Sequence, residues 1–246
     1  MLKVKVWSGE NSGACFTRPD NKVERVSYDV MTPSAARGVL EAIFWKPEFS
    51  WQVREIQVLK EVKRRSILRN EVKTLASEKT AQKWARDSGG FNAEDDRSQR
   101  HTLILWDVAY VICADIVLRP HTADPLVKYT EMFQRRVEKG QAFHQPYLGT
   151  REFTAFFGPP EPGDRPANIV RQLGGEYAEQ RGELDLGLML FDLRFEEAKK
   201  GRVKYRAHGD KGPRWVQGNA QPIFFDAKLR NGGVLHVPAE LYGGPS

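Results

Sequence analysis

The sequence contains few residues that could bind a metal ion. Only two of its 246 residues are cysteines, Cys15 and Cys113. Cys113 lies in the apolar run 111–114, which favours a buried free thiol over a zinc ligand. None of the five histidines is spaced from another histidine or a cysteine as metal ligands are. We therefore expect neither a metal nor another cofactor.

Several common sequence signals are also missing. The sequence has no P-loop, dinucleotide fingerprint or nucleophile elbow, which excludes the enzyme classes that these motifs reveal. No apolar run is long enough to cross a bilayer, so we expect no contact with a membrane. The first residues alternate apolar and charged side chains, as a strand does and a secretory signal does not. These features predict a cytoplasmic protein.

The composition is typical of a soluble globular protein, with 40% hydrophobic and 28% charged residues. The 38 lysines and arginines exceed the 32 acidic residues, giving a net charge of +6. A modest positive charge favours polyanionic partners without establishing one.

Hydrophobic periodicity predicts six regular elements in the first part of the chain. Thr32-Pro33 and Asp124-Pro125 each resemble a helix start, with a capping residue followed by proline. The predicted strands are residues 2–6, 51–58, 102–118 and 151–157. The order is strand, helix, strand, strand, helix, strand, which is the ferredoxin-like or RRM-like arrangement. Residues 77–98 are polar and contain glycine, so they predict a mobile insertion.

The last third of the chain predicts β structure. Residues 158–168 contain four prolines and two glycines and are the clearest linker. Strands are expected at 186–195 and 223–229, and Asn231-Gly232-Gly233 predicts a hairpin. We predict an α+β protein, with a ferredoxin-like (RRM-like) domain over residues 1–157 and a smaller antiparallel β domain over 158–246.

Basic and aromatic residues occur together in five clusters. Cationic side chains neutralise phosphates, and aromatic rings stack on the bases of single-stranded RNA. The alternative is that each cluster is a solvated surface with an aromatic core anchor. The residues that we predict to bind RNA are Arg37, Phe44, Trp45, Lys46, Arg69, Arg100, His101, Arg135, Arg136 and Arg151.

Long strings in this sequence resemble a known family. These strings are residues 14–19 (ACFTRP), 22–47 (KVERVSYDVMTPSAARGVLEAIFWKP), 69–72 (RNEV), 99–112 (QRHTLILWDVAYVI) and 128–153, which contains EMFQRRVEKGQAFHQPYLGTREF. They resemble the Cas five-d family of type I-C CRISPR systems, and the likeness spans nearly the whole chain.

The resemblance implies a ferredoxin-like domain, a C-terminal β domain and an enzyme that cuts the repeat hairpins of precursor CRISPR RNA at their base. It also implies that the protein stays on the 5′ handle of the mature guide. Its partners would then be the large and backbone subunits of the type I-C effector complex. Metal-independent cleavage lets a ribose 2′-hydroxyl attack the adjacent phosphate, which leaves a cyclic phosphate.

The resemblance also implies a tyrosine at the end of the first helix and a Lys-His pair at the start of the second. These positions fall on Phe44, Lys128 and Tyr129, so two of the three residues differ. Tyr129 assisted by Lys128 could transfer the protons, or His144 or His101 could replace the missing histidine. Alternatively, cleavage is slow and depends on positioning alone. Lys128, Tyr129 and His144 are the candidate catalytic residues, although Tyr129 also fits the apolar stripe of its helix.

Three functions follow from these observations. The first is a metal-independent endoribonuclease that remains bound to its product. The second is a guide-handle scaffold without nuclease activity, which Phe44 favours because its ring cannot exchange a proton. The third is a protein that contacts duplex DNA, which the positive charge alone supports.

Overall fold

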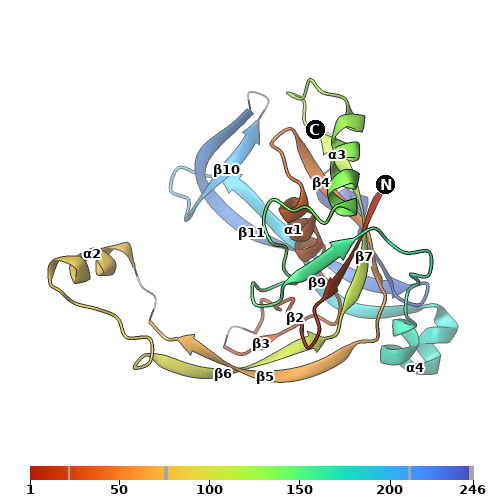
Figure 1. Ribbon diagram of the computed structural model, residues 1–246, viewed down its shortest axis with the longest axis horizontal. Helices are drawn as coiled ribbons and strands as arrows, with labels where there is room; N and C mark the ends of the chain where they lie inside the picture. The colour runs from red at the N-terminus through yellow and green to blue at the C-terminus, as the bar shows by residue number, and fades with distance from the viewer. Residues whose placement is uncertain (22, 75–76, 210–211, 244–246) are drawn as a thin grey trace.

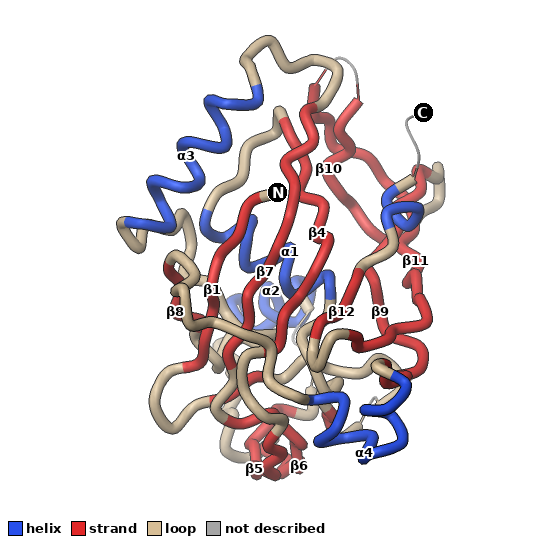
Figure 2. The backbone as a smooth tube through the Cα atoms, turned by 90° about the vertical axis from the view of Figure 1, so that its right-hand side faces the viewer, coloured by secondary structure: helices blue, strands red, loops and turns tan. Residues whose placement is uncertain are grey.

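The computed structural model describes residues 1–21, 23–74, 77–209 and 212–243. Lys22, the first residue of the family string 22–47, lies outside these ranges. Residues 244–246, at the end of the predicted C-terminal domain, also lie outside them. The fold is a mixed α+β arrangement built around a large antiparallel sheet (Figure 2).

The ferredoxin-like order predicted for the first part is confirmed. Its six elements are β1 (Leu2–Ser8), α1 (Pro33–Ile43), β4 (Phe49–Val58), β7 (Ala109–Leu118), α3 (Leu126–Glu138) and β8 (Ala155–Gly158). β1 pairs antiparallel with both β7 and β8, and β7 pairs antiparallel with β4. The spatial order is therefore second, third, first and fourth strand, as in a split βαβ fold.

Helix α1 begins where the sequence predicts. The Thr32 side chain accepts a hydrogen bond from the backbone N–H of Ala35, and Pro33 occupies the first turn. This cap satisfies one of the free donors at the helix start. Ala36, Val39, Leu40 and Ile43 are buried, so one face of the helix packs on the sheet. The helix ends at Ile43.

The prediction of one long strand over residues 102–118 is wrong. The chain forms β6 (Arg97–Trp106) and β7, separated by Asp107, which has a φ of 55°. β6 joins a second sheet with β2 (Gly13–Ala14), β3 (Arg25–Val26) and β5 (Lys63–Val72). The β5–β6 hairpin extends away from the main sheet as an arm, with α2 (Glu78–Arg86) at its end (Figure 1). The segment 77–98, predicted as a mobile insertion, contains this helix.

The C-terminal strands continue the main sheet. They are β9 (Glu183–Glu197), β10 (Val203–Gly209), β11 (Gly212–Arg230) and β12 (Val234–His236), followed by the short helix η1 (Ala239–Tyr242). The predicted hairpin at Asn231 is confirmed, because β11 pairs antiparallel with β12. The expectation of only β structure is wrong, since α4 (Ile169–Arg181) precedes these strands.

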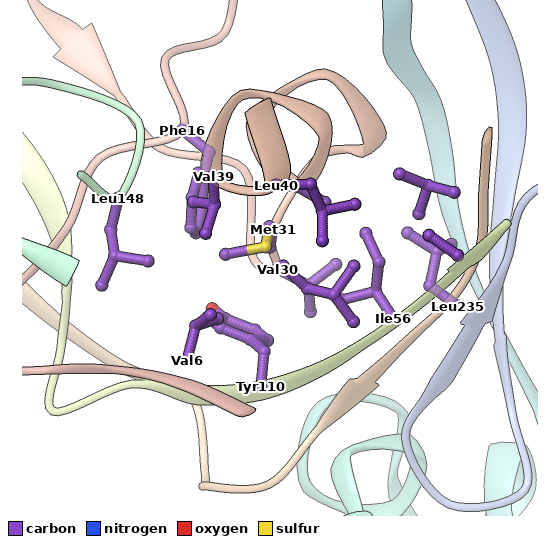
Figure 3. Close-up of a cluster of buried hydrophobic side chains, with 14 of the residues drawn as sticks. Val6, Phe16, Val30, Met31, Val39, Leu40, Ile56, Tyr110, Leu148 and Leu235 are labelled. Atoms are coloured by element: carbon purple, nitrogen blue, oxygen red, sulfur yellow. The ribbon is translucent and has the colours of Figure 1, made fainter. Parts of the chain in front are cut away.

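The two predicted domains share one sheet and one core. β12 pairs with β4, and this pairing joins the C-terminal strands to the ferredoxin-like sheet. Leu235 from β12 lies opposite Ile56 from β4, and both belong to the same buried cluster as Leu40 of α1 (Figure 3). The predicted boundary at residue 157 falls inside β8. The division into domains remains a prediction, although the sheet does not separate the two parts.

Among the described residues, no helix combines the length and apolar character needed to cross a membrane. Cys15 and Cys113 are both buried free thiols, as predicted for Cys113.

The shared core makes a testable prediction about stability. Leu235→Ala should lower the free energy of unfolding by about 2–5 kcal/mol, because Leu235 is fully buried and its loss leaves a cavity. Urea unfolding followed by tryptophan fluorescence and circular dichroism should show a single shifted transition. The matched control is Leu188→Ala, since this exposed leucine should contribute within about 0.5 kcal/mol. Two separate transitions, with only one shifted, would show that the parts unfold independently.

Candidate nucleic-acid interface

The C-terminal end of α1 is where three parts of the chain meet. The carbonyl oxygens in the last turn of a helix have no partners within the helix. Here the carbonyl of Ala42 accepts from the backbone N–H groups of Phe143 (2.9 Å) and His144 (3.1 Å). The carbonyl of Phe44 accepts from the indole of Trp51 at 2.9 Å. These bonds join the end of α1 to the loop at 143–144 and to β4.

Arg136 of α3 makes a third contact with this helix end. Its guanidinium donates to the carbonyl of Ile43 at 2.6 Å and lies over the Phe44 ring, 5.1 Å from the centroid. A cation at a helix C-terminus also interacts favourably with the helix dipole. Arg136 therefore joins α3 to α1, and its predicted contact with RNA stays a prediction.

Phe44 is part of the core. Its side chain is 1% exposed and packs against Phe49, with ring centroids 5.3 Å apart. A base cannot stack on a buried ring, so the structure favours a core role for Phe44, and its contact with RNA stays a prediction. Phe49 also contacts Tyr129, with centroids 5.5 Å apart. The Phe49 ring thus lies between Phe44 and Tyr129 and contacts both of them.

Lys128 and Tyr129 lie in the first turn of α3 and share one acceptor. The Lys128 ammonium donates to Asp124 Oδ2 at 2.6 Å, and the Tyr129 hydroxyl donates to the same oxygen at 3.4 Å. We call these three residues the Lys128 site. Asp124 was expected to cap the helix, but the N-cap is Pro125, and no side chain caps this end. The Asp124 carboxylate instead bonds the two candidate catalytic side chains.

The charges fix the protonation states of this site at neutral pH. The hydrogen bond from Lys128 holds the pKa of Asp124 below its ordinary value, and the same bond raises the pKa of Lys128. Burial, followed by the charges of Glu48 and Asp124, raises the pKa of the Tyr129 hydroxyl. Lys128 is therefore a cation and Tyr129 is neutral. A raised pKa leaves even less phenolate at neutral pH than in free tyrosine, so Tyr129 is left with the role of a hydrogen-bond donor.

A groove lies beside the end of α1. It has a volume of about 870 Å³, and its lining includes Trp45, Phe143, His144, Tyr147 and Arg151. We call it the aromatic groove. The Phe143 ring is 71% exposed and the Trp45 ring 37% exposed. Exposed rings beside a guanidinium offer both stacking surfaces and a phosphate ligand. Three of the predicted residues, Trp45, His144 and Arg151, thus lie together.

The loop that carries the groove residues is held in place by its backbone. Leu148 is fully buried, its N–H donates to the carbonyl of Phe153 (2.7 Å), and its carbonyl accepts from Cys15 (3.1 Å). Gly149 has a φ of 86°, and a Cβ there would overlap the carbonyl of Cys15. Only glycine tolerates this approach. The buried leucine and the glycine leave Tyr147 and Arg151 on the surface.

Other predicted RNA ligands are paired within the chain. Arg37 donates to both carboxylate oxygens of Asp192, at 2.8 and 2.9 Å, and to Glu41 at 2.7 Å. Arg69 lies 2.8 Å from Glu152 and 3.4 Å from Glu71. Both arginines connect elements of the fold, and their contact with RNA stays a prediction. Lys46 is half-buried and Arg135 is exposed.

His101 and Arg100 lie on the arm, away from the Lys128 site. The two residues belong to β6, which lies at the opposite end of the molecule from α3 in both views (Figures 1 and 2). His101 Nδ1 is 3.4 Å from Ser66 Oγ, and Arg100 is 4.0 Å from Glu71. His101 therefore cannot replace a histidine at the start of α3. His144 lies in the aromatic groove, where its ring contacts Phe143.

Two polar residues near α3 went unpredicted. Glu48 Oε2 and His121 Nδ1 are buried atoms without a hydrogen-bond partner in the described structure. Neither residue belongs to a basic or aromatic cluster, so no pattern in the sequence identifies them. In the described ranges, no three histidine, cysteine or acidic side chains are arranged to hold a metal ion.

The fold and these sites define a ferredoxin-like protein with a cationic and aromatic surface around its first helix. The family model described as CRISPR-associated protein (Cas_Cas5) matches residues 1–236. The chain belongs to this Cas5d family, and the resemblance seen in the sequence is confirmed.

Two curated relatives carry the name CRISPR pre-crRNA endoribonuclease Cas5d. The protein from Thermus thermophilus is 51% identical over 98% of this chain and 93% of its own length. The protein from Mannheimia succiniciproducens is 41% identical over 96% of this chain and 94% of its own length.

Solved structures share the fold at low sequence identity. An uncharacterised protein from Streptococcus mutans, SMU1763c, has a TM-score of 0.57 at 17% identity and covers 96% of this chain and 92% of its own. A structure named CRISPR-associated protein has a TM-score of 0.55 at 21% identity, over 98% of this chain and 92% of its own.

The hydrogen-bonded pair at the start of α3 predicts a titration effect. Asp124→Asn should lower the pKa of Lys128, because the neutral amide no longer stabilises the ammonium. NMR titration of the lysine side chains checks this expectation. Glu138→Gln at the far end of α3 is the matched control and should leave Lys128 unchanged. A Lys128 pKa that is equal in wild type and Asp124→Asn would contradict the pairing.

Proposed function

We propose that this chain is a metal-independent endoribonuclease that cuts precursor CRISPR RNA at the base of its repeat hairpins. It then remains on the 5′ handle of the guide as a subunit of the type I-C effector complex, beside the large and backbone subunits. The observation that carries this proposal is the Lys128 site, on a chain 51% identical to a protein named as a pre-crRNA endoribonuclease.

The arrangement supports different roles for the Lys128 site and the aromatic groove. The Lys128 ammonium is exposed and offers a positive charge to the developing phosphorane. The aromatic groove offers rings and Arg151 to unpaired nucleotides near the cut. Arg135 and Lys46 extend the positive charge beyond the groove and the Lys128 site.

A cleavage assay that compares the wild type with variants of the Lys128 site tests the proposed reaction. Purified protein in excess EDTA should cut its own repeat RNA at one position and leave a cyclic phosphate. Lys128→Ala should slow the single-turnover rate about 10²–10³-fold, as losing a charge that stabilises a transition state does. Tyr129→Phe keeps the buried ring and should slow the reaction less. Lys139→Ala, at the exposed end of α3, is the matched control and should cut normally.

The alternative function is a guide-handle scaffold without nuclease activity, and the buried Phe44 is the observation that favours it. Tight binding of an intact repeat RNA in EDTA would support this scaffold. Phe44→Tyr should then raise cleavage if the position once held a proton-transfer residue, and no gain would remove that argument. Equal affinity for random duplex DNA and repeat hairpin at physiological salt would instead indicate a duplex-DNA-binding protein.

The aromatic groove predicts a separate effect on binding. Trp45→Ala should weaken binding of the repeat RNA by about 1–3 kcal/mol, because a stacked base loses its ring. Filter binding at fixed salt measures the affinity, and thermal unfolding checks that the variant is folded. Trp215→Ala removes another exposed tryptophan, on β11, and is the control. Unchanged affinity for Trp45→Ala with lower thermal stability would show that Trp45 serves the core alone.

A further inference from the structure

One face of α1 is only partly buried, and it lines two hollows in succession. Residues spaced four apart lie on the same face of a helix, and Ser34, Gly38 and Ala42 have this spacing. Gly38 and Ala42 line the aromatic groove, whereas Ser34 and Gly38 line a second hollow beside the start of α1. The aromatic groove is therefore followed by another hollow along the same helix face.

The second hollow has a volume of about 280 Å³ and a neutral, hydroxyl-bearing lining that includes Thr17, Thr32 and Ser34. We call it the hydroxyl hollow. The Thr32 and Ser34 hydroxyls lie 3.1 Å apart, and Phe16 supplies an apolar wall. None of the described residues that line this hollow is charged. It can therefore bind the oxygens of a ligand by neutral hydrogen bonds, which the aromatic groove with its arginine does not rely on alone.

Gly38 and Tyr147 mark the passage between the two hollows, because each of them lines both. Gly38 is exposed on α1, and the Tyr147 side chain is 42% exposed on the loop that follows α3. Helix α1 thus forms one wall of the passage and the loop forms the other. The Gly149 approach to Cys15 fixes the loop close to Tyr147, so the position of this second wall is set by the fold.

Nothing in the fold requires a glycine at position 38. Gly38 lies inside α1, where glycine is among the least favourable residues. A Cβ added there would meet no atom within 4 Å, and the backbone does not have the positive φ that favours glycine. A side chain at this position would instead project toward the passage. Glycine is also the residue found where a ligand approaches the backbone closely, and Gly38 keeps the passage open.

We infer that an unpaired RNA strand runs along α1 from the aromatic groove, across Gly38, into the hydroxyl hollow. This inference rests on the proposed RNA-processing function for the identity of the ligand. The bare backbone at Gly38 admits the strand, and the exposed Tyr147 ring stacks on one of its bases. A base within a duplex does not offer its face to a ring, so this passage is specific for unpaired nucleotides. Gly38 is the specificity-determining residue of the path.

Gly38→Leu tests the path with two readouts that move in opposite directions. The midpoint of thermal unfolding should rise by about 2–4 °C, because leucine favours the helix more than glycine does. The affinity for the protein's own repeat RNA, measured by filter binding, should fall about 5- to 150-fold, the loss expected for one stacked base. The dependence of affinity on salt should not change, since no charge is removed. Lower stability with unchanged affinity would show that Gly38 serves the fold alone and would overturn the inference.

Gly163→Leu is the matched control. Gly163 is another glycine at which a Cβ would meet no atom within 4 Å, and it lies in the linker after β8. This variant should bind the repeat RNA with an affinity within about twofold of wild type. Gly38→Ala adds a single methyl group and should weaken binding less than Gly38→Leu does. An equal loss in Gly163→Leu would mean that a new surface leucine, and not the blocked passage, causes the effect.

Repeat RNA without its unpaired flanks shows what the passage holds. Trimming the flanks should weaken binding to the wild type, and Gly38→Leu should then cause no further loss, because the strand that it excludes is already absent. Changes at independent sites instead add in free energy. Losses that multiply, with Gly38→Leu weakening the trimmed hairpin as much as the full repeat, would overturn the path.

The same experiment separates this inference from the proposed endoribonuclease function. A wild type that binds the repeat RNA in EDTA and leaves it intact, with the expected loss in Gly38→Leu, would reject the nuclease and support the path. A wild type that cuts the RNA, with Gly38→Leu binding within about twofold of it, would reject the path and leave the nuclease. A wild type that does not bind the repeat RNA would reject both.

Discussion

The end of α1 depends on other parts of the chain to satisfy its free carbonyl groups. Helix α1 has no C-capping glycine, so the backbone cannot fold back to bond its own last turn. The loop at 143–144, Arg136 of α3 and Trp51 of β4 supply the donors instead. Each donor comes from a different segment. The hydrogen bonds to the end of α1 therefore position the aromatic groove, α3 and the sheet relative to one another.

The distribution of charge follows from the same packing. Arg37, Arg69 and Arg136 are basic residues in the sequence, but each is used inside the fold, by Asp192, Glu152 and a helix carbonyl. The net positive charge therefore overstates the number of cations available to an RNA partner. Lys128, Arg135 and Arg151 remain exposed, around the end of α1 and along α3. Surface ion pairs such as Lys128–Asp124 add little stability. This pair is better explained by its effect on the site, because Asp124 accepts hydrogen bonds from both Lys128 and Tyr129.

The sequence predicted correctly those elements whose formation depends on residues that are adjacent in the chain. Thr32-Pro33 starts α1, the alternation at residues 2–6 forms β1, and Asn231-Gly232 turns the chain into β12, since each depends on neighbouring residues alone. The predictions were wrong where one residue changes the backbone direction. Asp107 adopts a positive φ and divides an otherwise continuous run of strand-forming residues. Gly174 and Gly175 lie inside α4, and the non-helical backbone of Gly175 disrupts the periodicity that would have revealed the helix.

The sequence by itself determined the ferredoxin-like order, the family and the identity of Lys128 as a candidate, because periodicity, capping residues and long family strings are properties of the linear chain. It also determined that Phe44 lacks a hydroxyl. Only the tertiary structure decided which basic residues are free, because pairing depends on partners as distant in sequence as Arg37 and Asp192. Burial and hydrogen bonding are properties of the folded chain, and no sequence pattern encodes them for a single arginine.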